Sequence, residues 1–272
     1  MGSLDSAVAL VTGASRGIGK GCALALGAAG ATVYVTGRTQ ESGSSALGGS
    51  LAATVDAVAS LGGQGIAVAC DHVNDDEVSA VFARIERERG HLDLLVNNAF
   101  AVPERIDPQT PFWETPISDW DVMMDVGTRS AYVATHHAAQ VMVAAESGLI
   151  VNVSSAGAVR FFHHIAYGIG KAALDRLTKD AARPLAAHGV AVVSVWPYLV
   201  RTERVMRMPG VDPAITESPE FTGRGIVALA SDPEVMRWTG RAMTTHSLAD
   251  AYGFTDVDGR LPPDQPWHPP LA

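Results

Sequence analysis

A glycine-rich stretch near the amino terminus restricts the fold of this chain more than any other feature. The four apolar residues Val-Ala-Leu-Val at 8–11 run into Gly13, Gly17 and Gly19, and an alanine-rich segment follows as far as Ala29. This order of strand, glycine turn and helix is that of a dinucleotide-binding unit, although the spacing is GxxxGxG rather than GxGxxG. Glycine lets the backbone approach a pyrophosphate, and the free N–H groups of a helix start attract the anion. A plain glycine-rich turn is the alternative interpretation.

Short apolar runs alternate with longer helical patterns along the chain, which predicts an α/β fold. We expect strands near residues 7–12, 31–36, 65–70, 92–97, 148–154, 190–196 and 241–245, with helices in most gaps. The second helix is expected to begin after Gly43-Ser44-Ser45 and to reach Leu61. Such βαβ units predict one Rossmann-type, doubly wound domain, with a seven-stranded, mostly parallel sheet and helices on both faces. This domain is expected to span residues 1–260. Residues 261–272 are too rich in proline for a helix or a central strand and predict an extended arm.

Composition limits the classes of partner. The 272 residues, 47% of them apolar, suffice for one well-cored domain. A formal charge of −9 disfavours nucleic acid and anionic membrane, so a small-molecule substrate fits better. Residues 1–6 lack the features of a signal peptide and no apolar run has the length of a membrane span, which predicts a cytoplasmic protein. Cys22 and Cys70 are expected to be buried thiols, with no disulfide and no metal site.

Tyr167 and Lys171 form the candidate acid/base pair. They are four positions apart, so on a helix both side chains leave the same face about one turn from each other. A phenol with an ordinary pKa near 10 is a poor acid or base at neutral pH, and a nearby ammonium lowers that pKa. An ordinary helix with a half-buried tyrosine and a solvated lysine is the alternative.

The end of the second predicted strand bears on the choice of dinucleotide. A carboxylate at this place binds the ribose 2'-hydroxyl of NAD, whereas a guanidinium holds the 2'-phosphate of NADP in a forked contact. The chain has Arg38 here and no acidic residue. NADP(H) is therefore expected in preference to NAD(H), unless Arg38 is simply a solvated surface residue.

Four separate segments in the right order resemble the short-chain dehydrogenase/reductase (SDR) superfamily. They are the glycine stretch, Asn97-Asn98-Ala99, the strand that ends in Ser154-Ser155, and Tyr167 with Lys171. The resemblance runs from about Ala7 to Gly240. Residues 112–116 and 248–260 are most similar to the branch called dehydrogenase/reductase SDR family member 1, which is associated with NADPH-dependent reduction of ketones.

The resemblance implies a catalytic tetrad and a set of cofactor contacts. Tyr167 is the expected general acid/base, Lys171 holds the nicotinamide ribose, and a serine binds the substrate oxygen. Ser154 lies thirteen residues before Tyr167, the usual family spacing, and Ser155 twelve, but the second serine usually acts and we choose Ser155. Asp125 falls at the family's asparagine. The expected cofactor-binding residues are Gly13, Ser15, Arg16, Gly17, Ile18, Gly19, Arg38, Asp71, Asn98, Ala99, Tyr167, Lys171, Val200 and Thr202.

Three residues depart from the family pattern. Asp125 replaces an amide by a carboxylate, and Phe100 and Tyr198 stand where glycine is usual. We expect an NADP(H)-dependent carbonyl reductase or alcohol dehydrogenase of altered or modest activity. The alternative is an NADP(H)-binding sensor or interaction protein with little turnover. The resemblance also implies a homodimer or homotetramer, built on helices near 120–146 and 165–188, and a substrate pocket lined by residues 161–164.

Overall fold

The computed structural model describes residues 3–43, 45–103, 109–162, 164–264 and 266. Its centre is one sheet of seven parallel strands in the order β3-β2-β1-β4-β5-β6-β7. The strands are β1 (Val8–Val11), β2 (Thr32–Gly37), β3 (Gln64–Ala69), β4 (Leu94–Asn97), β5 (Gly148–Val153), β6 (Val190–Trp196) and β7 (Ala242–Thr244). The predicted doubly wound α/β fold is confirmed, and each predicted strand lies within a few residues of an observed one.

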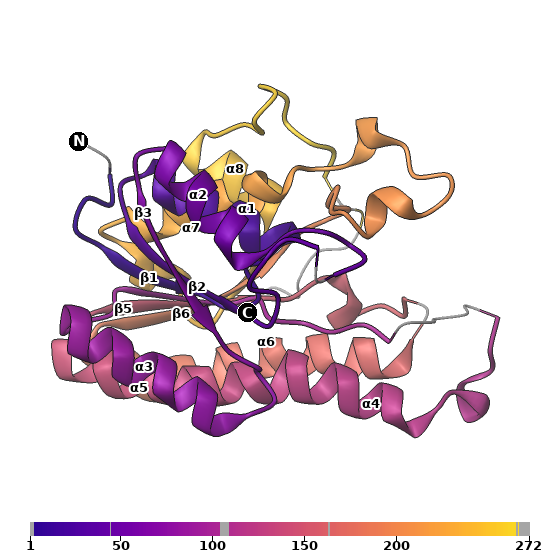
Figure 1. The fold of residues 1–272 in the computed structure, drawn as a ribbon, viewed down its shortest axis with the longest axis horizontal. Helices are drawn as coiled ribbons and strands as arrows, with labels where there is room; N and C mark the ends of the chain where they lie inside the picture. Colours follow the sequence, from indigo (N-terminus) through magenta and orange to yellow (C-terminus); the bar gives the residue numbers. More distant parts are fainter. Residues whose placement is uncertain (1–2, 44, 104–108, 163, 265, 267–272) are drawn as a thin grey trace.

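Helices cover both faces of the sheet, as Figure 1 shows. One face carries α1 (Gly17–Ala28), α2 (Leu51–Ser60), α7 (Pro219–Ala230) and α8 (Thr245–Tyr252). The other carries α3 (Asp75–Arg89), α5 (Ser130–Ala145) and α6 (Ile165–Leu185), with α4 (Ile117–Met124) leading into α5. Because both faces are covered, the central strands are mostly apolar, and every residue of β6 is buried, Ser194 included.

Two apolar cores result, one on each face. Leu26 of α1, Val58 of α2 and Ile226 of α7 belong to the first core. Phe82 of α3 and Ala138 of α5 belong to the second. Cys22 lies in the first core and Cys70 in the second, and both are free, buried thiols.

Helix ends follow the local sequence. Asn74 caps α3, because its side chain accepts from the backbone N–H groups of Asp76 and Glu77, and Gly90 ends the helix with a φ of 77°. The second helix was expected to begin soon after Ser45, and this boundary is wrong. Gly48 and Gly49 have φ values of 76° and 73°, so α2 begins only at Leu51, after its cap Ser50.

The start of the expected proline-rich arm packs on the domain. Pro262 is buried, and its carbonyl oxygen lies 2.9 Å from Nδ1 of His246 in α8. Residues 265 and 267–272 of the arm lie outside the described part of the chain. Within that described part, none of the helices has the length and apolar character needed to cross a membrane.

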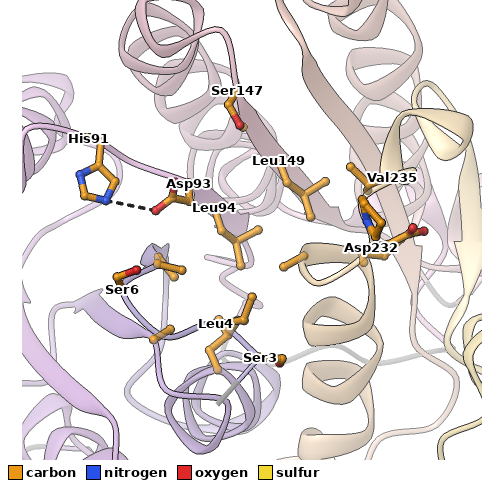
Figure 2. A pocket seen from close by; sticks show the side chains of 18 of the residues that line it. Ser3, Leu4, Ser6, His91, Asp93, Leu94, Ser147, Leu149, Asp232 and Val235 are labelled. Carbon is orange, nitrogen blue, oxygen red and sulfur yellow. Dashed lines mark ion pairs between the residues drawn. The ribbon is translucent and has the colours of Figure 1, made fainter. Parts of the chain in front are cut away.

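The amino ends and the carboxyl ends of the parallel strands lie at opposite sides of the sheet and differ in what surrounds them. A hollow of about 510 Å³ lies at the amino ends of the strands and is lined by Ala9, Leu94 and Leu149 (Figure 2). Its charged groups serve the structure: Asp93 accepts from the backbone nitrogen of Val8 at 2.7 Å and pairs with His91 at 3.3 Å. In parallel α/β sheets ligands bind at the opposite edge, where the order of strands switches, which here is the carboxyl end of β1 beside β4.

Candidate active site

The glycine turn after β1 packs directly on the end of β4. Gly13 and Gly17 have φ values of 66° and 56°, a left-handed conformation that residues other than glycine rarely adopt. A Cβ on Gly13 would lie 2.7 Å from Cα of Ala99, and one on Gly19 would lie 2.3 Å from Nδ2 of Asn98. The glycines therefore place the amino end of α1 at the switch point of the sheet.

Asn98 and Ala99 brace this turn through Thr12. The Asn98 side chain donates from Nδ2 to the carbonyl oxygens of Thr12, at 2.8 Å, and Gly13, at 3.0 Å. The backbone nitrogens of Asn98 and Ala99 both donate to Oγ1 of Thr12. The Asn98 amide is thus used to hold the turn. Thr12 was not among the predicted site residues, although a hydroxyl directly before Gly13 is a visible signal in the sequence.

A carboxylate lies at the amino end of α1. Glu203 accepts through Oε2 from the backbone nitrogen of Gly17 at 3.0 Å, and the Thr202 methyl would lie 3.4 Å from a Cβ on Gly17. The segment that follows β6 therefore crosses the start of α1. Because an anionic oxygen is bound there, this N–H is directed to receive an anion, as a pyrophosphate site requires. Glu203 was not predicted, since no motif marks it.

Arg16 and Arg38 flank the end of β2. The Arg16 guanidinium donates from Nε to the carbonyl oxygen of Gly48 at 2.7 Å and from Nη2 to Oγ1 of Thr39 at 3.0 Å. Burial lowers the pKa of Arg16, Glu203 opposes this shift, and the charge of Arg38 adds to it. The Arg38 side chain is 69% exposed, with Nη1 3.9 Å from Oδ2 of Asp71. Two guanidiniums and one carboxylate thus lie where an adenosine ribose is expected.

Ser155 and Tyr167 meet at the carboxyl end of β5. Oγ of Ser155 lies 2.8 Å from Oη of Tyr167, and also accepts from the backbone nitrogen of Gly157. Ser154 points the other way: its hydroxyl is buried and donates to the carbonyl oxygen of Lys171 at 3.1 Å. Neighbouring side chains leave a strand on opposite sides, so only Ser155 reaches the phenol.

Lys171 lies one helical turn beyond Tyr167, buried beneath the phenol. Its ammonium donates to the carbonyl oxygen of Val153 at 3.0 Å and lies 5.7 Å from the centre of the Tyr167 ring. Burial lowers the pKa of Lys171 to about 8, and the carboxylate of Asp175 opposes this shift. A lysine with this pKa is mostly charged at neutral pH and loses its charge within the physiological range.

The pKa of Tyr167 departs from the expectation. Burial raises it, and the hydrogen bond with Ser155 opposes part of that rise. Lys171 was expected to lower the pKa of the phenol. The expected direction is wrong for this structure because desolvation of the phenolate outweighs the stabilising contacts. The phenol is therefore held in its protonated form at neutral pH.

Asp125 does not lie with the other expected tetrad members. It begins a π-helical turn, Asp125–Arg129, between α4 and α5, and its side chain is exposed. There it lines a surface hollow with Asp75 and Arg129. The turn presents Gly127 to the interior instead, two residues further on. A helical turn directs residues two apart to different sides, so Asp125 faces solvent where Gly127 is buried. A role for Asp125 in the tetrad stays a prediction.

Comparisons with known proteins show the family to which the chain belongs. The model of the short chain dehydrogenase family matches residues 7–209. The chain belongs to the short-chain dehydrogenase/reductase family. The chain is 44% identical to dehydrogenase/reductase SDR family member 1 of Mus musculus, over 93% of this chain and 84% of the relative, and 42% identical to the same-named protein of Homo sapiens, over 94% and 85%. A solved metagenomic short-chain oxidoreductase in complex with NADP is 29% identical, with a TM-score of 0.73 over 89% of this chain and 97% of that one.

This short-chain dehydrogenase/reductase holds its segment after β6 through Glu217. Val200 is buried and pairs with Glu217 in an isolated parallel bridge, and the backbone of Glu217 bonds to Leu199 and Arg201 on either side. The Glu217 carboxyl accepts from Thr245 at 2.7 Å and from the backbone of Tyr198. Burial raises its pKa to about 7. Tyr198, which stands where the family usually has glycine, is thus part of a fixed segment. Glu217 was not among the predicted site residues.

The expected pocket residues of this oxidoreductase differ in their surroundings. Phe161 is 68% exposed. His164 caps α6 by accepting from the backbone nitrogen of Ala166, and its Nε2 lies 3.3 Å from Oδ2 of Asp119 in α4. His163 lies outside the described residues. His164 therefore fixes the start of the helix that carries Tyr167.

Proposed function

We propose that this protein is an NADP(H)-dependent oxidoreductase that transfers a hydride between the nicotinamide and a carbonyl or secondary alcohol substrate. The observation that carries the proposal is the 2.8 Å contact between Ser155 Oγ and Tyr167 Oη, with Lys171 one turn further along α6. These groups lie at the carboxyl edge of the sheet, the edge that also carries the glycine turn.

The protein's own residues account for the proton in this reaction. When bound, the reduced nicotinamide supplies a hydride, that is two electrons, to the carbonyl carbon. Tyr167 gives its phenol proton to the carbonyl oxygen, and Ser155 hydrogen-bonds the same oxygen as negative charge develops on it. Oxidation of the alcohol runs the same proton in reverse. Lys171 keeps a positive charge near the phenolate that reduction leaves behind.

The shift of the Tyr167 pKa favours carbonyl reduction as the direction. Burial raises the pKa of Tyr167, so the phenol carries its proton at neutral pH and is ready to donate it. Alcohol oxidation needs the phenolate and therefore a higher pH. We infer a carbonyl reductase in preference to an alcohol dehydrogenase.

The residues at the glycine turn fit a dinucleotide, because the Gly17 N–H is directed at an anionic oxygen. Gly13, Ser15, Gly17, Ile18 and Gly19 would hold the pyrophosphate, and Arg16 with Arg38 a 2'-phosphate. Asp71, Asn98 and Ala99 would lie along the adenosine, while Val200 and Thr202 would contact the nicotinamide and Lys171 its ribose. The NADP complex of the metagenomic relative supports this choice of cofactor.

The proposed substrate is a small apolar ketone or its alcohol, and the proposed setting is a cytoplasmic homodimer or homotetramer. Apolar side chains left exposed on α5 and α6, Tyr132 and Ile169, support contacts between subunits. Nucleic acid and anionic membranes are not proposed as partners, because the formal charge of −9 disfavours them.

The test is a screen of the purified protein with NADPH and NADH against aromatic, aliphatic and steroid ketones, followed at the absorbance of the reduced nicotinamide. We expect turnover with NADPH, its loss in Tyr167→Phe, and no change in the control Tyr132→Phe, whose ring is exposed. Tight binding of NADPH without turnover of any ketone would instead support the sensor. Turnover unaffected by Tyr167→Phe would overturn the proposed acid.

A further inference from the structure

The ring of Phe100 occupies the space between the catalytic helix and the turn before α5. Its centre lies 4.7 Å from Nζ of Lys171, which sits over the ring. The same ring meets Tyr167 edge-on, with the two centres 5.7 Å apart and an angle of 72° between the planes. One aromatic side chain therefore contacts both members of the proposed acid/base pair.

The space for this ring exists because residue 127 is glycine. A Cβ on Gly127 would lie 2.7 Å from Cδ2 and 3.0 Å from Cε2 of Phe100, closer than carbon atoms approach without displacement. Gly127 lies at the middle of the π-helical turn Asp125–Arg129, where the chain bends against α6. Phe100 and Gly127 are thus complementary in shape, so a side chain at either place limits the other.

We propose that Phe100 is a positioning residue which, together with Gly127, holds the Lys171 ammonium and the Tyr167 ring in place with an aromatic face instead of a polar side chain. The face of a benzene ring carries partial negative charge and attracts a cation, most strongly where water is excluded. Lys171 is buried, so this attraction is little screened. The inference rests on the proposed function for its chemical meaning, while the contact itself is a property of the unliganded protein.

The charged groups around Lys171 must be considered beside the Phe100 ring. Asp175, one turn further on α6, raises the pKa of Lys171 and is itself held by Ser194 and Trp196 of β6. On the elements packed against the start of α6, Asp119 pairs with His164 and Arg129 pairs with Asp75. The side chains of Asp121 and Asp125 on the same elements are exposed to solvent. Among the described residues, the ammonium itself contacts the carbonyl oxygen of Val153 and the Phe100 ring, with the Tyr167 ring further away at 5.7 Å.

The sequence makes a direct test possible, because Lys20, Lys171 and Lys179 are its only lysines. Protein labelled with ¹³C at the lysine ε carbon gives three NMR signals, which Lys20→Arg and Lys179→Arg assign. The pKa of Lys171 is then read from a pH titration without cofactor or substrate. Phe100→Leu keeps an apolar side chain of similar size but removes the aromatic face. We expect it to lower the pKa of Lys171 by about half a pH unit or more.

Two controls separate this role from simple filling of space. Phe82→Leu makes the same change in the core between α3 and α5 and should leave the pKa of Lys171 unchanged. Gly127→Ala should lower that pKa in the wild-type background, because the added Cβ displaces the ring, and should have no further effect in Phe100→Leu. An unchanged or raised pKa in Phe100→Leu, or additive effects of the two substitutions, would overturn the inference.

The outcome is separable from that of the proposed function. A lowered Lys171 pKa in Phe100→Leu supports the positioning role even where the ketone screen finds no turnover. An unchanged Lys171 pKa refutes that role even where Tyr167→Phe abolishes turnover. With an active ketone in hand, Phe100→Leu should also move the alkaline limb of the pH profile of kcat/KM down by the shift that NMR measures.

Discussion

The Glu203 carboxylate lies 3.0 Å from the backbone nitrogen of Gly17, at the start of α1. The two residues come from opposite halves of the chain, since Glu203 follows β6 and Gly17 follows β1. The contact places a fixed negative charge where a dinucleotide pyrophosphate is proposed to bind. Binding of the cofactor must therefore move Glu203 away or bring two negative groups together.

Removal of that charge is expected to strengthen dinucleotide binding. Glu203→Gln keeps the size of the side chain and lowers the repulsion, so the dissociation constant of NADPH should fall about three- to tenfold at low salt. Fluorescence titration measures it, with Glu234→Gln, an exposed residue after α7, as the control. Weaker binding in Glu203→Gln would show that the carboxylate supports the site.

Arg38 is expected to select NADPH over NADH. Loss of its guanidinium in Arg38→Ala should raise the dissociation constant of NADPH about tenfold or more, because a charge-assisted contact to a phosphate is lost. NADH has no 2'-phosphate, so its affinity should stay within about twofold. Arg84→Ala, in an exposed pair with Glu88 on α3, is the control. Equal losses for the two dinucleotides would argue against the assignment.

Turnover is expected to fall at alkaline pH as Lys171 loses its charge. Burial lowers the pKa of Lys171 to about 8, whereas it raises that of Tyr167. Lysine is charged below its pKa, so carbonyl reduction should be constant below pH about 7 and should decline as the pH rises through about 8. A profile of kcat/KM against pH tests this. In Lys171→Arg, which keeps its charge at every pH tested, any remaining activity should lack the decline near pH 8.

The fold was predictable because its signals are local and repeated. Most buried strands are short apolar runs, and Gly13, Gly17 and Gly19 mark a turn at which the backbone packs closely on the end of another strand. The boundary of α2 was predicted too early, because only the conformations of Gly48 and Gly49 show that the helix starts after them. Periodicity finds elements, and conformation at single residues fixes their ends.

The site was predictable only where its residues lie within one element. Tyr167 and Lys171 share a helix, so their spacing in sequence gives their spacing in space. Contacts between segments far apart in the sequence could not be predicted in this way. Examples are the hydrogen bond of Glu203 with Gly17 and the packing of Phe100 on Gly127. Asp125 was assigned from its likeness to an asparagine motif, and the sequence did not show that it begins a π-helical turn in which Asp125 is exposed and Gly127 is buried.

Substitution of Ser155 is expected to reduce catalysis, whereas substitution of the adjacent Ser154 is expected to reduce stability. Ser155→Ala removes the hydroxyl 2.8 Å from Tyr167 and should lower kcat about a hundredfold, as loss of a donor to a developing oxyanion does. Ser154→Ala breaks the bond to the Lys171 carbonyl oxygen and should lower the free energy of unfolding by about 1 kcal/mol. Kinetics and denaturant unfolding of both variants distinguish them. The reverse pattern would assign the catalytic hydroxyl to Ser154.

Asp125→Asn is expected to leave turnover unchanged, although it restores the amide typical of the family. The Asp125 side chain is exposed and lines a surface hollow with Asp75 and Arg129, so an amide there reaches neither Tyr167 nor Lys171. Loss of the Asp125 charge should lower the pKa of Arg129, because Asp75 and, to a smaller extent, Asp125 raise that pKa. Steady-state kinetics of Asp125→Asn beside Asp121→Asn, an exposed residue of α4, test this. A severalfold gain in kcat in Asp125→Asn alone would instead support the tetrad role that the family resemblance implies for residue 125.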